Sequence, residues 1–103
     1  MPQSIITYTF TTGARDDWHR QIAALVAAMN TDPDLKGRIA YRVLKERNGD
    51  RYWHIASAVD DAALKALQDK DYFRRYQAAN RRIGGNSHQV VGTETIAETD
   101  FRG

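Results

Sequence analysis

The sequence of 103 residues contains no cysteine, only two prolines and no long apolar run. Without cysteine, disulfides and thiolate-ligated metal sites are excluded. The longest stretch free of strongly polar residues, residues 22–29, is far shorter than the ~20 residues of a membrane-spanning helix. The start, Met1-Pro2-Gln3-Ser4, has no basic segment followed by an apolar one, so a signal peptide is not predicted. We therefore expect a cytoplasmic protein without a membrane partner.

Net charge is also small, because 15 Lys and Arg residues stand against 13 Asp and Glu residues. A basic cluster is expected to form the solvated face of a helix: Lys70, Arg74, Arg75, Arg81 and Arg82. Residues 36–41 faintly resemble an aromatic RNA-binding signature, but they carry Arg and Ile where stacking aromatic residues belong. A nucleic-acid partner is therefore not expected.

Cofactor motifs are missing as well. Gly84-Gly85 follows a predicted helix, whereas a phosphate-binding glycine loop precedes one. The three histidines, His19, His54 and His88, have no paired spacing, so a metal site is not predicted. We expect no nucleotide, flavin, haem or metal cofactor.

Hydrophobic periodicity divides the chain into strands and helices. Residues 4–11 alternate apolar and hydroxyl side chains, as a strand with one buried face does. A helix is predicted over residues 15–30, because an apolar stripe at helical spacing runs through it and Pro33 follows its end. The stripe consists of Trp18, Ile22, Leu25, Val26 and Met29.

Two further strands are predicted over residues 37–47 and 50–59. Asn48-Gly49 lies between them, and both residues tolerate the positive φ of a type I′ hairpin turn. A second helical region then begins with Asp60 as its cap, is interrupted at residues 69–71 and stops at Gly84-Gly85. The part after the interruption carries the apolar stripe Tyr72, Tyr76, Ala79 and Ile83, and a last strand is predicted over residues 87–98.

This order of elements predicts an α+β, ferredoxin-like βαββαβ fold, with both helical regions on one face of a four-stranded antiparallel sheet. The length suits a single domain over residues 1–103. The uncovered face of the sheet would expose an apolar patch, expected to contain Ile39, Tyr41, Val43, Trp53, Ile55, Val59 and Val91. Because large apolar patches usually mark an interface, we expect a homodimer that forms through this face.

The order of elements and one stretch of sequence resemble the antibiotic biosynthesis monooxygenase-like (ABM-like) group of dimeric α/β-barrel proteins. The stretch starts in the third strand with residues 52–54 (YWH), passes an acidic cap and reaches residues 63–67 (ALKAL), in the place of the group's "ALKAH"-like turn. After a short break, Tyr72-Phe73 stands where an aromatic pair opens the main part of the second helix. The similarity of element order covers about the whole chain and implies a dimeric α/β barrel.

The resemblance does not extend to the haem-degrading branch of the group. That branch uses an Asn on the first strand, a Trp at the end of the third strand and a His on the second helix. Here the first strand has no Asn, Ala58 or Val59 holds the Trp position, and Tyr76 or Gln77 holds the His position. Haem degradation is therefore not expected.

Ligands of the group bind between the sheet and the helices, which makes His54 the main candidate for chemistry if its face meets the helices. An imidazole with an ordinary pKa of about 6.5 can take a proton from a phenolic substrate. Tyr8, Tyr72 and Tyr76 would approach the same cleft, where their hydroxyls could stabilise a developing oxyanion. The structural alternative is a core histidine hydrogen-bonded to a tyrosine or a backbone carbonyl, beside tyrosines that only pack.

We predict a small-molecule enzyme that resembles cofactor-independent monooxygenases and acts on phenolic or quinol-type aromatic substrates. The predicted catalytic residues are His54, Tyr72 and Tyr76, and the predicted substrate-binding residues are Tyr8, Tyr52, Phe73 and Arg42. Arg42 has a second interpretation, an ion pair with Glu46 or Glu94 across the sheet. Two other functions stay open on the same fold: a non-catalytic homodimer that binds a small ligand or serves as a scaffold, and isomerase or decarboxylase chemistry.

Overall fold

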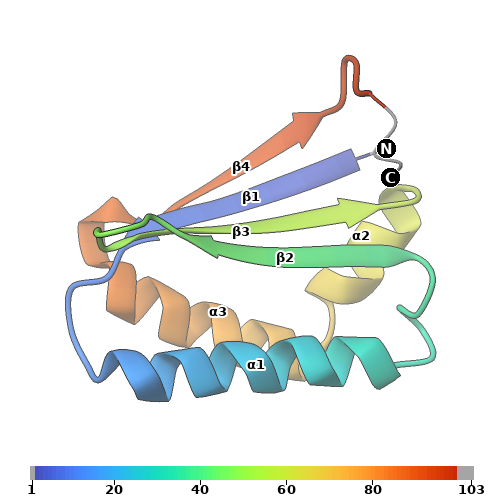
Figure 1. Cartoon of the computed structure of the whole chain (residues 1–103). Helices are drawn as coiled ribbons and strands as arrows, with labels where there is room; N and C mark the ends of the chain where they lie inside the picture. The colour runs from blue at the N-terminus through green and yellow to red at the C-terminus, as the bar shows by residue number, and fades with distance from the viewer. Residues whose placement is uncertain (1, 100–103) are drawn as a thin grey trace.

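The computed structural model describes residues 2–99 and shows an antiparallel four-stranded sheet with all helices on one side (Figure 1). The strands are β1 (Pro2–Thr9), β2 (Ile39–Lys45), β3 (Arg51–Ala58) and β4 (Gln89–Glu94), in the spatial order β2-β3-β1-β4. The helices are α1 (Arg15–Thr31), α2 (Asp61–Gln68) and α3 (Asp71–Gly84), and one 3-10 turn, η1 (Gly85–Ser87), follows them. The predicted ferredoxin-like fold is confirmed, with the second helical region divided into two helices.

The buried face of α1 and the start of α2 follow from local sequence. The predicted stripe of α1 is buried at Trp18, Ile22, Leu25 and Met29, and this burial holds the helix on the sheet. The carboxylate of Asp60 caps α2 by accepting the N–H of Ala63 at 2.8 Å, as predicted.

The buried face of α3 is turned from the predicted one. Its buried residues are Phe73, Tyr76, Asn80 and Gly84, whereas Tyr72, Ala79 and Ile83 are half-buried at the margin. Gly84 lets α3 approach β1 closely, because a Cβ at this position would lie 2.6 Å from the Cβ of Tyr8. The last turn of α3 therefore contacts β1 more closely than a residue with a side chain would allow.

The β2–β3 hairpin turns at Asn48-Gly49, as predicted, but the turn is of a different type. A type I′ turn needs a positive φ at both central residues, and in this hairpin only Asn48 has one, at 58°. Instead, the N–H of Gly49 donates to the carbonyl of Glu46 at 3.3 Å, and the N–H of Glu46 donates to the carbonyl of Arg51 at 2.9 Å. The resulting register pairs Val43 with His54.

This register corrects the expected composition of the uncovered sheet face. Ile39, Tyr41 and Val43 lie on the helix-covered side, where they pack against the core, because their partners on β3 are buried there. Val59 follows the end of β3 and is 50% exposed. The large apolar side chains on the uncovered face are Ile5, Leu44, Trp53, Ile55 and Val91. The prediction was therefore right for Trp53, Ile55 and Val91.

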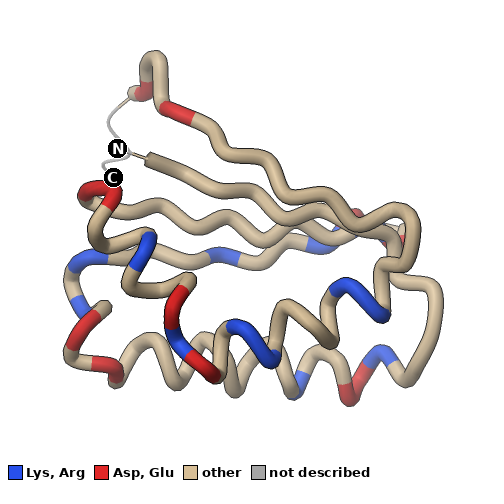
Figure 2. Tube along the Cα trace, turned by 180° about the vertical axis from the view of Figure 1, so that it is seen from behind, with Lys and Arg blue, Asp and Glu red and all other residues tan. Residues whose placement is uncertain are grey.

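Charged residues lie mainly on the helices, the loops and the edge strand β2 (Figure 2). β1 carries no charged residue, and β3 carries only Arg51. The two central strands therefore provide almost uncharged surroundings for side chains on either face. Within residues 2–99, no helix is long and apolar enough to span a membrane.

Candidate functional site

His54 lies at the centre of the helix-covered sheet face and has no exposed surface. Burial alternates along β3, so every second residue from Tyr52 to Ala58 is buried on this side. His54 is flanked by Ile6 on β1 and Val43 on β2. The imidazole is therefore enclosed between the sheet and the helices.

Three tyrosine hydroxyls surround this imidazole. The hydroxyl of Tyr8 lies 2.9 Å from Nε2, that of Tyr41 lies 2.9 Å from Nδ1, and that of Tyr76 lies 3.2 Å from Nδ1. Trp18 joins the group from α1, because its indole N–H donates to the Tyr8 oxygen at 2.7 Å. Its ring also stacks on Tyr76, with centroids 5.1 Å apart. We name these five residues the histidine cluster.

The bond from Trp18 favours one tautomer of His54. The indole N–H of Trp18 can only donate, so the oxygen of Tyr8 accepts it, and the Tyr8 O–H can then donate to Nε2. On this ground we predict that Nε2 is an acceptor and that a neutral ring carries its proton on Nδ1. That proton faces the hydroxyl oxygens of Tyr41 and Tyr76.

Burial keeps the histidine cluster neutral. Desolvation, with a smaller contribution from His88, lowers the pKa of His54 to about 3. Desolvation also raises the pKa of Tyr8, Tyr41 and Tyr76 above the ordinary range of a phenol. At neutral pH the ring is therefore uncharged, and all three hydroxyls keep their protons.

A cavity of about 30 Å³ adjoins His54. Its lining includes Tyr41, Leu64, Leu67, Phe73 and Gln77. This volume matches a single water molecule, so an aromatic ring can enter only when the side chains of α2 and α3 move outward. Among residues 2–99, no group of three His, Cys, Asp or Glu side chains is placed to hold a metal ion.

Some of the predicted site residues meet at this cavity. Tyr8 and Tyr76 contact His54 directly, and Phe73 lines the cavity with its ring edge-on to Tyr41 at a centroid distance of 6.2 Å. Tyr52 stacks on Tyr8 at 5.3 Å. Its hydroxyl, however, bonds to Nε2 of His19 at 2.7 Å, so Tyr52 supports the cluster without reaching the imidazole.

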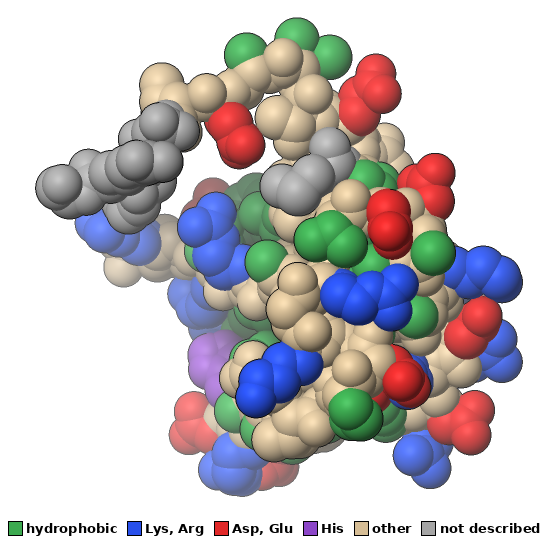
Figure 3. Space-filling view, turned by 90° about the vertical axis from the view of Figure 1, so that its right-hand side faces the viewer, with side chains coloured by type: hydrophobic (Ala, Val, Ile, Leu, Met, Phe, Trp, Pro, Cys, Tyr) green, Lys and Arg blue, Asp and Glu red, His purple; other side chains and the backbone are tan. Residues whose placement is uncertain are grey.

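Tyr72 points elsewhere, toward the loop after α1. At the right-hand end of the molecule in Figure 1, which Figure 3 shows face-on, charged side chains of both signs surround small apolar patches. The hydroxyl of Tyr72 donates to Oδ2 of Asp32 at 2.8 Å, and Nζ of Lys70 lies 3.2 Å from the same oxygen. Burial, and then the bond to Asp32, raise the pKa of Tyr72 to about 12. These contacts fasten the start of α3 to the loop after α1.

Arg42 lies on the other face of the sheet from His54, opposite Ile55. It therefore cannot contact a ligand at the imidazole. Neither Glu46 nor Glu94 pairs with it among the ion pairs of the described residues. Glu94 is out of reach because β3 and β1 separate β4 from β2.

Sequence reasoning missed three members of this region: Tyr41, Trp18 as a hydrogen-bond donor, and Asn80. A signal for Tyr41 exists, because counting outward from Asn48-Gly49 pairs Val43 with His54 and puts Tyr41 on the same face. The apolar stripe of α1 indicates that Trp18 is buried but not which group its N–H contacts. Asn80 is fully buried, and neither polar atom of its amide has a hydrogen-bond partner in the part of the chain that the structure describes.

At the level of sequence, no family model and no curated protein matches the chain. Solved structures do match. A crystal structure of an antibiotic biosynthesis monooxygenase aligns over 94% of this chain and 100% of its own, with 18% identity and a TM-score of 0.76. SnoaB, a cofactor-independent oxygenase from Streptomyces nogalater, aligns over 94% of this chain and 95% of its own, with 17% identity and a TM-score of 0.72.

A third structure is described as a dimeric ferredoxin-like protein from Jannaschia sp. CCS1. It aligns over 92% of this chain and 100% of its own, with 19% identity and a TM-score of 0.70. Identities this low establish the fold and leave the activity to be argued from the site. The chain therefore has the fold of the ABM-like proteins, as the resemblance of its sequence implied.

Proposed function

We propose that this protein is a small-molecule enzyme of the cofactor-independent oxygenase type, which acts on phenolic or quinol-type aromatic substrates at His54. The histidine cluster carries the proposal. An imidazole and three phenols occupy a core that apolar side chains of similar size would fill at lower cost, because each buried polar group must be hydrogen-bonded. Strongly shifted pKa values concentrate at functional sites, and the shared fold with a cofactor-independent oxygenase supports the same conclusion.

His54 is the proton acceptor in this proposal. The pKa of His54 is low because burial disfavours the charged ring. A substrate phenolate beside the ring would supply a counterion and raise the pKa of His54. A substrate hydroxyl that donates to Nδ1 selects the other tautomer, with the proton on Nε2 and the Tyr8 oxygen accepting from both His54 and Trp18. The hydroxyls of Tyr41 and Tyr76 then donate to the substrate anion.

The anion reacts with dioxygen without help from a cofactor, provided that the substrate is electron-rich. In an anthrone-type substrate, a ring CH₂ group becomes a carbonyl and dioxygen is reduced to one carbonyl oxygen and one water. The carbon supplies all four electrons, so the protein needs only to bind the substrate, accept its proton, stabilise the anion and exclude water. The uncharged surroundings of His54 suit this task.

Oxygen uptake with a panel of anthrones and hydroquinones tests the proposal. We expect wild type to exceed the buffer rate with at least one compound, and His54→Ala to lose about 10²–10⁴-fold in kcat/KM because the proton acceptor is gone. Arg81→Gln, a change on the exposed side of α3, serves as the control and should keep the wild-type rate. Equal rates for wild type and His54→Ala would remove His54 from the mechanism.

The second candidate function is a non-catalytic homodimer that binds a small ligand. The size of the cavity at His54, about 30 Å³, favours it, because no aromatic ring fits without movement. Uptake at the buffer rate with every compound of the panel would decide for this candidate.

We also propose that two copies of the chain pair through the uncovered sheet face. Ile5, Ile55 and Val91 form a row across three strands, with Leu44 and Trp53 beside them. Leu44 is 42% exposed and Val91 is 47% exposed, although both are apolar, and a second copy would cover them. The description of the Jannaschia protein as dimeric supports this assembly.

Sedimentation equilibrium tests the dimer. We expect wild type to sediment as a dimer and Ile55→Asp as a monomer, because each copy would bury an unpaired carboxylate in an apolar interface. Ala78→Asp adds the same charge at an exposed position of α3 and should remain dimeric. A wild-type monomer at high protein concentration would contradict the proposal.

A further inference from the structure

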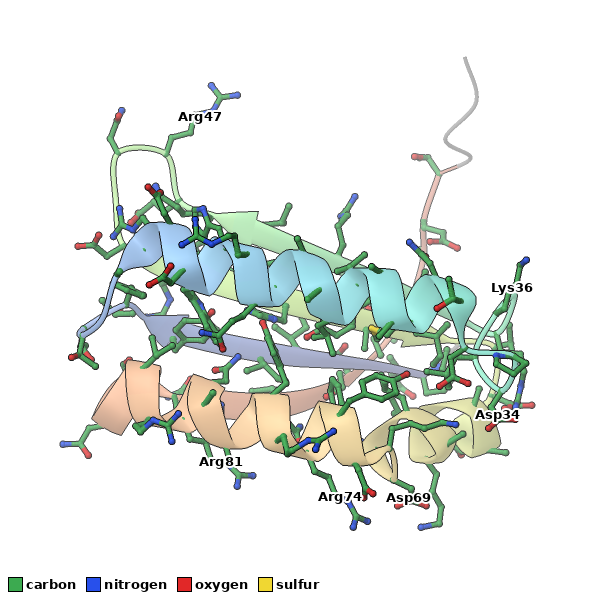
Figure 4. The ribbon with its side chains drawn as sticks, turned by 90° about the horizontal axis from the view of Figure 1, so that it is seen from below. Asp34, Lys36, Arg47, Asp69, Arg74 and Arg81 are labelled. Carbon is green, nitrogen blue, oxygen red and sulfur yellow. The ribbon has the colours of Figure 1, made fainter. Side chains whose placement is uncertain are left out.

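The groove between α1 and α3 offers space for a small molecule away from His54. The two helices lie side by side and run in opposite directions, on the side of the sheet away from the uncovered face (Figures 1 and 4). The groove has a volume of about 310 Å³, compared with about 30 Å³ for the cavity at His54. Its volume reaches the range of ligand pockets in proteins, roughly 300–1,000 Å³.

The walls and floor of this groove are apolar and partly aromatic. Ala24 and Ala28 of α1 face Ala79 of α3, and Leu25 and Tyr76 are buried beneath them. Because the wall residues are small, Tyr76 borders the groove as part of its floor although it is only 7% exposed. A flat apolar molecule would bury its face against this floor.

Arg75, a cation on the rim, has no partner among residues 2–99. Arg75 lines the groove, and no hydrogen bond or ion pair involves its side chain within the described part of the chain. By contrast, Arg74 pairs with Asp69 at 3.2 Å. The carboxylate of Asp32, near the same end, is already engaged by Tyr72 and Lys70. An anion in the groove would therefore meet the guanidinium of Arg75 without a competing carboxylate.

We propose that the α1–α3 groove binds an organic anion with a flat apolar body, an aromatic carboxylate, whose ring lies on Leu25 and Tyr76 and whose carboxylate contacts Arg75. The amide of Gln21, on the facing helix, supplies a further donor. The site is independent of the oxygenase proposal, because it requires no reaction. It does adjoin the histidine cluster, since the ring on its floor belongs to the tyrosine whose hydroxyl lies 3.2 Å from Nδ1 of His54.

A pair of matched compounds tests the charge requirement. Naphthalene-2-carboxylate and naphthalene-2-methanol are titrated into the protein while backbone amide shifts are followed by NMR. We expect saturable shifts confined to α1 and α3, with the carboxylate bound roughly tenfold more tightly, the effect of one charge-assisted hydrogen bond. Arg75→Gln should abolish this preference. Arg81→Gln should keep it, because the Arg81 side chain points away from α1 (Figure 4).

Filling the groove tests its location. Ala24→Leu places a larger side chain in the groove and should abolish binding of the carboxylate. Ala23→Leu makes the same change at a neighbouring exposed position outside the lining and should leave binding unchanged. The proposal is overturned by equal affinity for the two compounds, by an unchanged preference in Arg75→Gln, or by the absence of saturable shifts.

Discussion

Acidification from pH 7 to pH 4 is expected to lower the free energy of unfolding by about 3 kcal/mol through His54 alone. Burial holds the pKa of this ring at about 3 in the folded chain, whereas an exposed ring in the unfolded chain has a pKa of about 6.5. Above the higher value neither state binds a proton on the ring. Between the two values the unfolded state binds a proton that the folded state excludes, so stability falls as the pH falls.

Urea unfolding of wild type and His54→Gln at several pH values measures this effect. The variant is expected to be less stable at pH 7, because the hydroxyls around residue 54 lose a partner, but its stability should decline less steeply in acid. Burial also lowers the pKa of His88, which acts in the same direction, but His88 is present in both proteins and its effect cancels in the comparison. Identical pH dependence of the two proteins would show that His54 titrates alike in both states.

The pH effect depends on the face of the sheet to which His54 points. A sequence pattern predicts which residues of neighbouring strands share a face only when the pairing register of those strands is known. The alternation along β3 separates His54 from Trp53 and Ile55. The turn at Asn48-Gly49 fixes the pairing with β2, since the register survives even though the turn is not of type I′. The assignment of Tyr41 to the uncovered face ignored this pairing.

Apolar periodicity predicts which side of a helix faces the sheet less well than which residues of a strand share a face. In α1 four of the five residues of the predicted stripe are buried, and the fifth, Val26, is half-buried. In α3, aromatic and small residues spread over more than one face, so the pattern does not determine whether Tyr72 or Phe73 faces the sheet. The structure buries Phe73 and leaves Tyr72 at the margin, where it meets Asp32. The expected approach of Tyr72 to His54 therefore depended on an orientation that periodicity alone does not fix.

Hydrogen bonds between distant residues are beyond any local pattern. The contact between Trp18 and Tyr8 depends on how α1 crosses the sheet, which follows from the packing of the whole core. The burial of the Asn80 amide is likewise not predicted by any local pattern, because a polar residue on an amphipathic helix is expected to face water. The sequence therefore predicts the fold and the approach of Tyr8 and Tyr76 to His54. The sheet face of His54, its contact with Tyr41 and the bond from Trp18 emerge only with tertiary structure.

Trp18→Ala is expected to lower the free energy of unfolding by about 3–5 kcal/mol, because the side chain is 1% exposed and its removal leaves a large cavity. Truncation also removes the stacking partner of Tyr76 and the N–H donor of Tyr8. Urea unfolding at pH 7 measures the loss. A change below about 1 kcal/mol would mean that the core closes around the missing indole.

Trp18→Phe separates the N–H group from the bulk of the ring. Phenylalanine keeps much of the apolar contact but removes the indole donor of the Tyr8 oxygen, so the Tyr8 O–H is no longer favoured as the donor to Nε2 of His54. We expect the proton of the imidazole to move from Nδ1 in wild type toward Nε2 in the variant, which nitrogen-15 NMR of the labelled ring detects directly. Trp53→Phe, on the uncovered face, should leave the tautomer unchanged. A wild-type ring that already carries its proton on Nε2 would contradict the hydrogen-bond order from Trp18 through Tyr8 to His54, because that order requires the Tyr8 hydroxyl to donate.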